Sequence, residues 1–158
     1  MARVGLVVRE GLVFGVIAGA LSLLIRLVSV LATTDVTPTV FSDFVTSAIG
    51  LLIIGGAGRK LAAVTRGVGP AVPMGAIAGG ISELFRTVLA ALILSYLPVG
   101  QAAFNRLSPI EQRQASDLGS LILTLGLDLA LAMAFGALIG WLGAWSLLRF
   151  RPPRDPEA

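Results

Sequence analysis

Five ionisable side chains stand inside otherwise apolar stretches of this sequence. A charge placed in hydrocarbon costs at least about 2.5–3.5 kcal/mol on insertion scales, so such a group is expected to be paired or functional. Two uses fit these residue types: an arginine fork that neutralises a carboxylate, or a path along which protons or ions move. The expected intramembrane charged cluster consists of Arg26, Asp43, Glu83, Arg86 and Asp128.

The residue types that are missing remove several kinds of chemistry. The chain has no cysteine and no histidine, which excludes disulfides, thiolate nucleophiles, the usual catalytic base and the commonest zinc ligand. A serine–lysine dyad would need Lys60, which lies at the edge of an apolar segment, far from most serines. Around Asp128, the sequence lacks the second glycine of the Gly-x-Gly-Asp turn of membrane aspartyl proteases. We therefore expect no enzyme, no cofactor and no metal.

Composition indicates an integral membrane protein. Of the 158 residues, 56% are hydrophobic and only 13% are charged. A soluble domain of this size has too few polar side chains to cover so much apolar surface. The lipid bilayer is therefore the expected partner. The net charge of +3 is not arranged as a basic face interleaved with aromatic residues, so no nucleic-acid partner is expected.

The hydrophobic runs predict an all-α fold, a four-helix membrane bundle. A membrane helix needs roughly 20 apolar residues, and the chain holds four such runs. Ser108-Pro109-Ile110-Glu111 has the form of a capping box, so a further helix should start at Pro109. Whether that helix continues into the fourth span stays open. The expected spans are residues 11–31, 40–58 (with helix extending toward 65), 72–97 and 118–148.

The first span has an alternative interpretation as a signal peptide, with Val30-Leu31-Ala32 as a passable cleavage site. Two observations favour a retained helix. Arg26 interrupts the apolar run just before that site, and the same motif recurs at Gly75.

The basic residues are distributed very unevenly among the connections, which predicts an orientation in the cell membrane. The side with many Lys and Arg faces the cytoplasm, so both termini should be cytoplasmic. Only Arg106 and Arg113 fall on the other side. The cytoplasmic set is Arg3, Arg9, Arg59, Lys60, Arg66, Arg149, Arg151 and Arg154.

Residues 15–28 recur at 75–88 with eight identities in fourteen positions, which indicates an internal duplication. Asp43 is followed by glycines 12 and 15 residues later, and so is Asp128. The repeats would be two hairpins, 1–66 and 67–149, in the same orientation across the membrane. Residues 98–117 would be an extracytoplasmic insertion in the second hairpin, and 150–158 a disordered cytoplasmic tail.

Small residues recur at spacings of three and four, which places them on common helix faces. Such faces let helix backbones approach closely in lipid, so we expect them to be packing seams. The alternative is a tight pore or gate lined by bare backbone. The expected packing residues are Gly11, Gly15, Gly19, Ser22, Gly75, Gly79, Ser82, Gly136, Gly140 and Gly143.

Two functions from different classes fit these features. The first is a structural or accessory membrane protein that forms a homo-oligomer or binds a membrane-protein partner. The alternative is a channel or transporter for an ion or small solute that uses Glu83 and outer-leaflet arginine–aspartate pairs. Glu83 is the strongest candidate for a specialised role because its counterpart in the first repeat is Leu23. Each hairpin brings one arginine and one aspartate, Arg26 with Asp43 and Arg86 with Asp128. Whether each arginine pairs with the aspartate of its own hairpin or with that of the other stays open. Glu83 lies one turn from Arg86.

Overall fold

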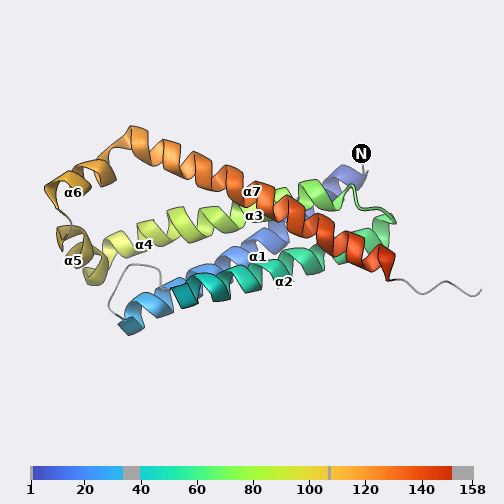
Figure 1. Cartoon of the computed structure of the whole chain (residues 1–158), viewed down its shortest axis with the longest axis horizontal. Helices are drawn as coiled ribbons and strands as arrows, with labels where there is room; N and C mark the ends of the chain where they lie inside the picture. Colours follow the sequence, from blue (N-terminus) through green and yellow to red (C-terminus); the bar gives the residue numbers. More distant parts are fainter. Residues whose placement is uncertain (1, 34–39, 107, 151–158) are drawn as a thin grey trace, which may run out of the picture.

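The computed structural model describes residues 2–33, 40–106 and 108–150. Within these ranges, the side chains of residues 2, 3, 33, 40–43, 103, 111 and 114–116 lie outside the described part. The described chain is almost all helical, apart from short connections, and contains no strand. Figure 1 shows long helices lying roughly along a common direction.

Four helical segments are long and apolar enough to cross a membrane, which confirms the number predicted from the hydrophobic runs. The first begins at Ala2 rather than at the expected residue 11, because nothing between Arg3 and Glu10 breaks a helix. The third segment joins three helical elements end to end. The segments are α1 (Ala2–Thr33), α2 (Val40–Thr65), α3 (Ala71–Leu84) with η1 (Phe85–Leu89) and α4 (Ala90–Tyr96), and α7 (Leu118–Arg149).

Two short helices join the third segment to the fourth: α5 (Pro98–Arg106) and α6 (Pro109–Ser116). The capping pattern predicted the start of α6, whereas α5 was not predicted. Asp117 separates α6 from α7, because its backbone is extended and its carboxylate accepts a hydrogen bond from the backbone N–H of Ser120 at 3.0 Å. This side-chain cap starts a new helix, so the stretch that begins at Pro109 is two helices.

Among the four long segments, α2 and α3 lie between α1 and α7. Both α1 and α7 pack against α2 and α3, and α2 also touches α3. Figure 1 shows α7 close to the other helices near its C-terminal end and diverging from them toward α6. We call the two ends of the bundle the α2–α3 end and the α5–α6 end, after the connections that lie there.

Close backbone contacts hold α7 in place at the α2–α3 end. A Cβ atom on Gly58 would collide with the carbonyl oxygen of Gly140, and one on Gly143 with that of Gly55. Likewise, a Cβ atom on Gly75 would collide with the carbonyl oxygen of Gly136, and one on Gly136 with that of Gly75. These contacts account for the core, in which alanines are frequent and the large side chains fully buried among the described residues are Leu61 and Met74.

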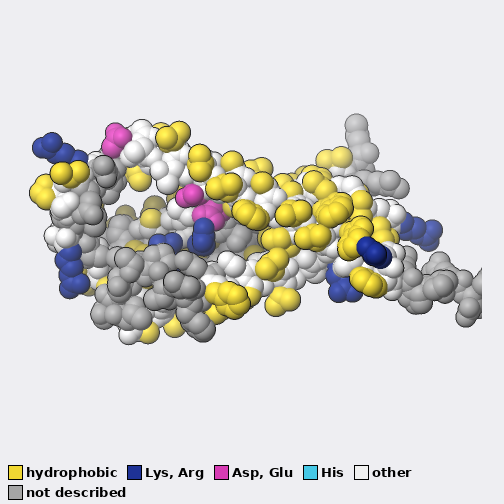
Figure 2. Space-filling model, viewed as in Figure 1, with side chains coloured by type: hydrophobic (Ala, Val, Ile, Leu, Met, Phe, Trp, Pro, Cys, Tyr) yellow, Lys and Arg dark blue, Asp and Glu magenta, His cyan; other side chains and the backbone are white. Residues whose placement is uncertain are grey.

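Charged side chains lie at both ends of the bundle and at one place between them. Figure 2 shows basic side chains at both ends, acidic and basic side chains together in a hollow partway along, and a mostly apolar surface from there toward the α2–α3 end. At the α2–α3 end, Lys60 Nζ lies 2.8 Å from the buried carboxylate of Glu10 and 5.4 Å from the ring centre of Phe14. This ion pair joins α1 to α2.

Candidate functional site

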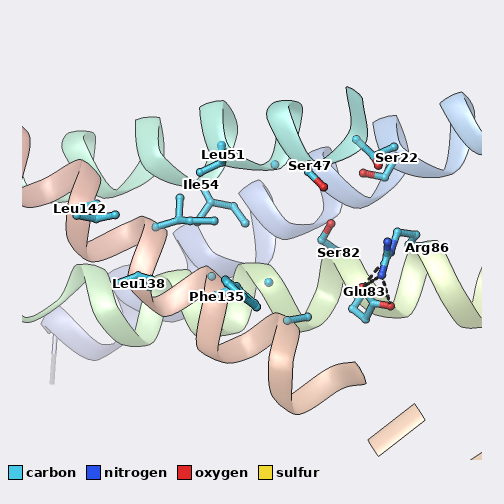
Figure 3. Close-up of a pocket in the computed structure, with 16 residues that line it drawn as sticks. Ser22, Ser47, Leu51, Ile54, Ser82, Glu83, Arg86, Phe135, Leu138 and Leu142 are labelled. Atoms are coloured by element: carbon cyan, nitrogen blue, oxygen red, sulfur yellow. Dashed lines mark hydrogen bonds and ion pairs between the residues drawn. The ribbon is translucent and has the colours of Figure 1, made fainter. Parts of the chain in front are cut away.

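A cleft of about 520 Å³ lies between α2, α3 and α7, with one residue of α1 reaching it. Figure 3 shows serines together with Glu83 and Arg86 toward one end of the cleft, and leucine, isoleucine and phenylalanine side chains toward the other. The polar lining residues are Ser22, Thr46, Ser47, Ser82, Glu83 and Arg86. The large apolar ones are Leu51, Ile54, Phe135, Leu138, Ile139 and Leu142.

An ion pair within α3 and η1 forms the charged part of the cleft. Arg86 donates from Nε to Oε2 of Glu83 at 3.0 Å and from Nη2 to Oε1 at 3.0 Å. Thr87 Oγ1 also donates to Oε1 of Glu83. The Glu83 side chain is 7% exposed and that of Arg86 is 41% exposed. A buried carboxylate is thus satisfied by a guanidinium that reaches the cleft.

The π-helical turn of η1 explains how Arg26 joins this group. The N–H of Ala90 donates to the carbonyl oxygens of Phe85 and Thr87 and bypasses that of Arg86. Arg26 Nη1, from α1, donates to the Arg86 carbonyl oxygen at 3.0 Å. A backbone carbonyl has two lone pairs and accepts hydrogen bonds when it is away from water, and Arg26 supplies a donor to the Arg86 carbonyl from α1.

The structure therefore differs from the expected arginine–aspartate pairs. Arg86 pairs with Glu83, and Asp128 takes part in none of the ion pairs among the described residues. The expected Arg86–Asp128 pair is thus wrong. The Arg86 guanidinium pairs instead with the carboxylate of Glu83, which lies one turn away on the same helix. Asp43 lies on α2, and its expected pair with Arg26 involves a side chain outside the described part.

Several lining residues were missed by the sequence analysis. Thr46 is buried with an exposed fraction of 8%, and Ser47 lies beside it in the lining. Ser47, Gly50 and Ile54 are spaced at three and four positions, which places them on one face of α2, and this spacing was available in the sequence. Thr87 lies four residues after Glu83, where a helical neighbour is expected.

The expected packing residues divide between seams and the cleft. Gly11, Gly15 and Gly19 of α1 face α3, where added Cβ atoms would lie 2.9 Å or less from side-chain or backbone atoms. Gly140 and Gly143 face helices rather than open space. Four of the set also line the cleft: Ser22, Gly79, Ser82 and Gly136.

The cleft offers hydrogen-bonding groups and one ion pair beside an apolar lining. Hydroxyl groups can donate and accept hydrogen bonds, and the ion pair is neutral as a unit. Among the described residues, no group of three or more acidic side chains is placed to hold a metal ion. No protein-family model matches the chain, and no curated protein or solved structure is similar to it.

Proposed function

We propose that this chain is an integral membrane protein that serves as a structural or accessory component, assembling with a second copy or with another membrane protein. The observation that carries the proposal is the coverage of α7. Only 6% of its most apolar stretch is buried, compared with 28–33% in the other three segments. The bundle therefore leaves much of the most apolar stretch of α7 exposed, although the glycines of this helix pack against α2 and α3.

Small residues give this uncovered part of α7 a face suited to helix contacts. Gly126, Ala130 and Ala134 are exposed and spaced by four, so they share one side of the helix. Lipid covers an apolar surface as well as protein does, so apolar exposure alone predicts nothing. A small-xxx-small face is different, because it favours close packing of helix on helix in lipid.

The test is disulfide crosslinking in native membranes. Because the chain has no cysteine, an introduced cysteine is the only one that this chain can contribute to a crosslink. We expect Ala130→Cys to form a crosslinked dimer or a crosslink to a stoichiometric partner. Leu121→Cys is the matched control, because nine helical positions place it on the opposite face of α7. Equal crosslinking of both variants, or a protein that purifies from mild detergent as a lone monomer, would contradict the proposal.

We also propose that two fused hairpins, 1–66 and 67–149, arose by duplication. The sequence spacing makes Gly55 equivalent to Gly140 and Gly58 equivalent to Gly143. In the structure, Gly55 meets Gly143 and Gly58 meets Gly140. Such a reciprocal exchange is what a twofold relation between two copies produces. The α1 and α3 faces do not follow it, because Gly15 meets α3 whereas its equivalent Gly75 meets α7.

The cleft favours a second candidate function, a carrier or channel for an ion or small solute. It holds a buried carboxylate next to a π-helical turn, and such turns are frequent at functional sites. Proton flux into proteoliposomes, followed with a trapped pH dye, tests it. A flux that Glu83→Gln abolishes, while expression and oligomeric state are unchanged, would favour this candidate over the accessory role.

A further inference from the structure

We propose that the cleft between α2, α3 and α7 binds a neutral amphiphile taken from the surrounding lipid. Its hydrogen-bonding head would lie among the serines beside Glu83, and its chain would lie along the apolar part of the lining. The inference rests on the proposed membrane location and is independent of the accessory role. Three properties of the cleft carry it: size, separation of polar from apolar lining, and charge.

The size of the cleft fits a whole small molecule. Its volume of about 520 Å³ lies within the range of about 300–1,000 Å³ that is usual for pockets that hold organic ligands. An ion or a water molecule would leave most of it empty. Gly50 contributes to this space, because a Cβ atom added there would meet nothing within 4 Å.

The lining is itself amphipathic. Ser22, Ser47 and Ser82 gather with the ion pair at one end in Figure 3, and Leu138 and Leu142 lie at the other. A ligand that matches both ends must carry a polar head and an apolar body. The head would face the α5–α6 end, which the basic-residue distribution predicts to be the extracytoplasmic side. A lipid of the outer leaflet has the same orientation.

The charge of the described lining argues for a neutral head. One acidic and one basic residue are present, and Arg86 engages both carboxylate oxygens of Glu83. A charged head would have to break this pair or remain unpaired in a mostly apolar site, and both are costly. Hydroxyl, ester or amide groups could instead exchange hydrogen bonds with the serine and threonine hydroxyls.

Access from the bilayer follows from the path of α7. The helix is held to α2 and α3 by its glycines at the α2–α3 end and diverges from them toward α6 (Figure 1). The residues of α7 that line the cleft all lie between Ala132 and Leu142, so we infer that a membrane lipid enters beside the diverging part of the helix, which does not line the cleft.

The experiment uses two light-activated probes of the same chain length, a diazirine monoacylglycerol and a diazirine fatty acid. Gly50→Leu fills the cleft, whereas Gly56→Leu adds the same side chain to α2 at an open position outside the lining. We expect the monoacylglycerol to label residues of α2 and α7 that line the cleft. Labelling should fall about tenfold in Gly50→Leu and stay at the wild-type level in Gly56→Leu.

Three results would overturn the proposal. Labelling spread evenly around the outer faces of the helices would show bulk lipid only, and equal labelling of both leucine variants would show that the cleft is not the site. Stronger labelling by the fatty acid would show an anionic head. If Gly50→Leu does not fold, Ser47→Leu fills the same face one turn away. Extraction of the wild type from membranes by detergent alone, and not by salt or alkali, tests the membrane location separately.

Discussion

At the scale of single residues, the structure satisfies its most buried carboxylate within one helical turn. Glu83 receives both arms of the Arg86 guanidinium and the hydroxyl of Thr87. Arg26 has a different role, since it donates to the backbone carbonyl of Arg86 at the π turn. Arg26 and Arg86, which lie at matching positions of the repeated sequence, thus bind different groups: a backbone carbonyl and a carboxylate.

The exposures of the two partners predict unequal effects of breaking their pair. Arg86→Ala leaves a carboxylate that is 7% exposed without its cation, so we expect a loss of about 3–5 kcal/mol in unfolding free energy. Glu83→Gln keeps an amide oxygen that can accept a hydrogen bond from the Arg86 guanidinium, whose side chain is 41% exposed, and should cost about 1–2 kcal/mol.

Unfolding in detergent, followed by circular dichroism with a chemical denaturant, measures both losses. The double variant Glu83→Gln/Arg86→Ala should be more stable than Arg86→Ala alone, because it no longer contains a buried carboxylate without its cation. Losses that add in the double variant would show that the pair does not contribute as a unit.

Arg26 allows a separate test of the π turn. Arg26→Leu removes the hydrogen bond to the Arg86 carbonyl and should cost about 1.5–3 kcal/mol, the usual contribution of a hydrogen bond that involves a charged group. Arg26→Lys keeps a donor on a long side chain and should recover part of that loss in the same unfolding experiment. A lysine variant no more stable than the leucine variant would argue against the carbonyl contact as the source of stability.

At the scale of elements, α7 depends on glycine for its position. The seams with α2 and α3 bring backbone against backbone at the α2–α3 end, and no side chain fits between them. Interfaces of this kind derive their stability from close van der Waals contact along the backbones, because lipid provides no hydrophobic driving force between helices.

Two glycines on α2, two positions apart, make a matched pair for this idea. Gly58→Ala puts a methyl group against the Gly140 carbonyl and should force α7 away from α2. Gly56→Ala adds the same methyl group in open space, and should be neutral or up to ~1 kcal/mol stabilising because alanine favours helix. Thermal unfolding in detergent should show a lower midpoint temperature for Gly58→Ala alone. Equal midpoint temperatures for the two variants would contradict the idea that the glycine contacts between α2 and α7 stabilise the bundle.

The sequence allowed the long elements and some of the local chemistry to be predicted. Hydrophobic length indicated the four segments, and the capping pattern indicated the start of α6 at Pro109. The spacing of Glu83 and Arg86 indicated their contact. These are local signals, read within a few helical turns. No spacing within one helix could predict the contact of Arg26 with the Arg86 carbonyl or the cleft, because both depend on how distant helices meet.

At the scale of the whole molecule, the two ends of the bundle differ in charge. Glu10 and Lys60 form an ion pair at the α2–α3 end, and Arg149 lies over the ring of Trp145, 4.8 Å from its centre, near the same end. The α5–α6 end carries only Arg106 and Arg113 as basic residues. Basic residues are retained on the cytoplasmic side during insertion and aromatic rings favour the membrane interface, so the bundle should have one orientation.

Single cysteines in this cysteine-free chain test that orientation. Gly69→Cys lies in the exposed connection between α2 and α3, and Asn105→Cys lies on exposed α5. With a membrane-impermeant maleimide on intact cells, we expect labelling of Asn105→Cys at once and of Gly69→Cys only after permeabilisation. The reverse pattern would invert the topology. Labelling of both from outside would mean that the helices between them do not cross the membrane, and both the cleft's lipid ligand and the accessory role would then lose their common basis.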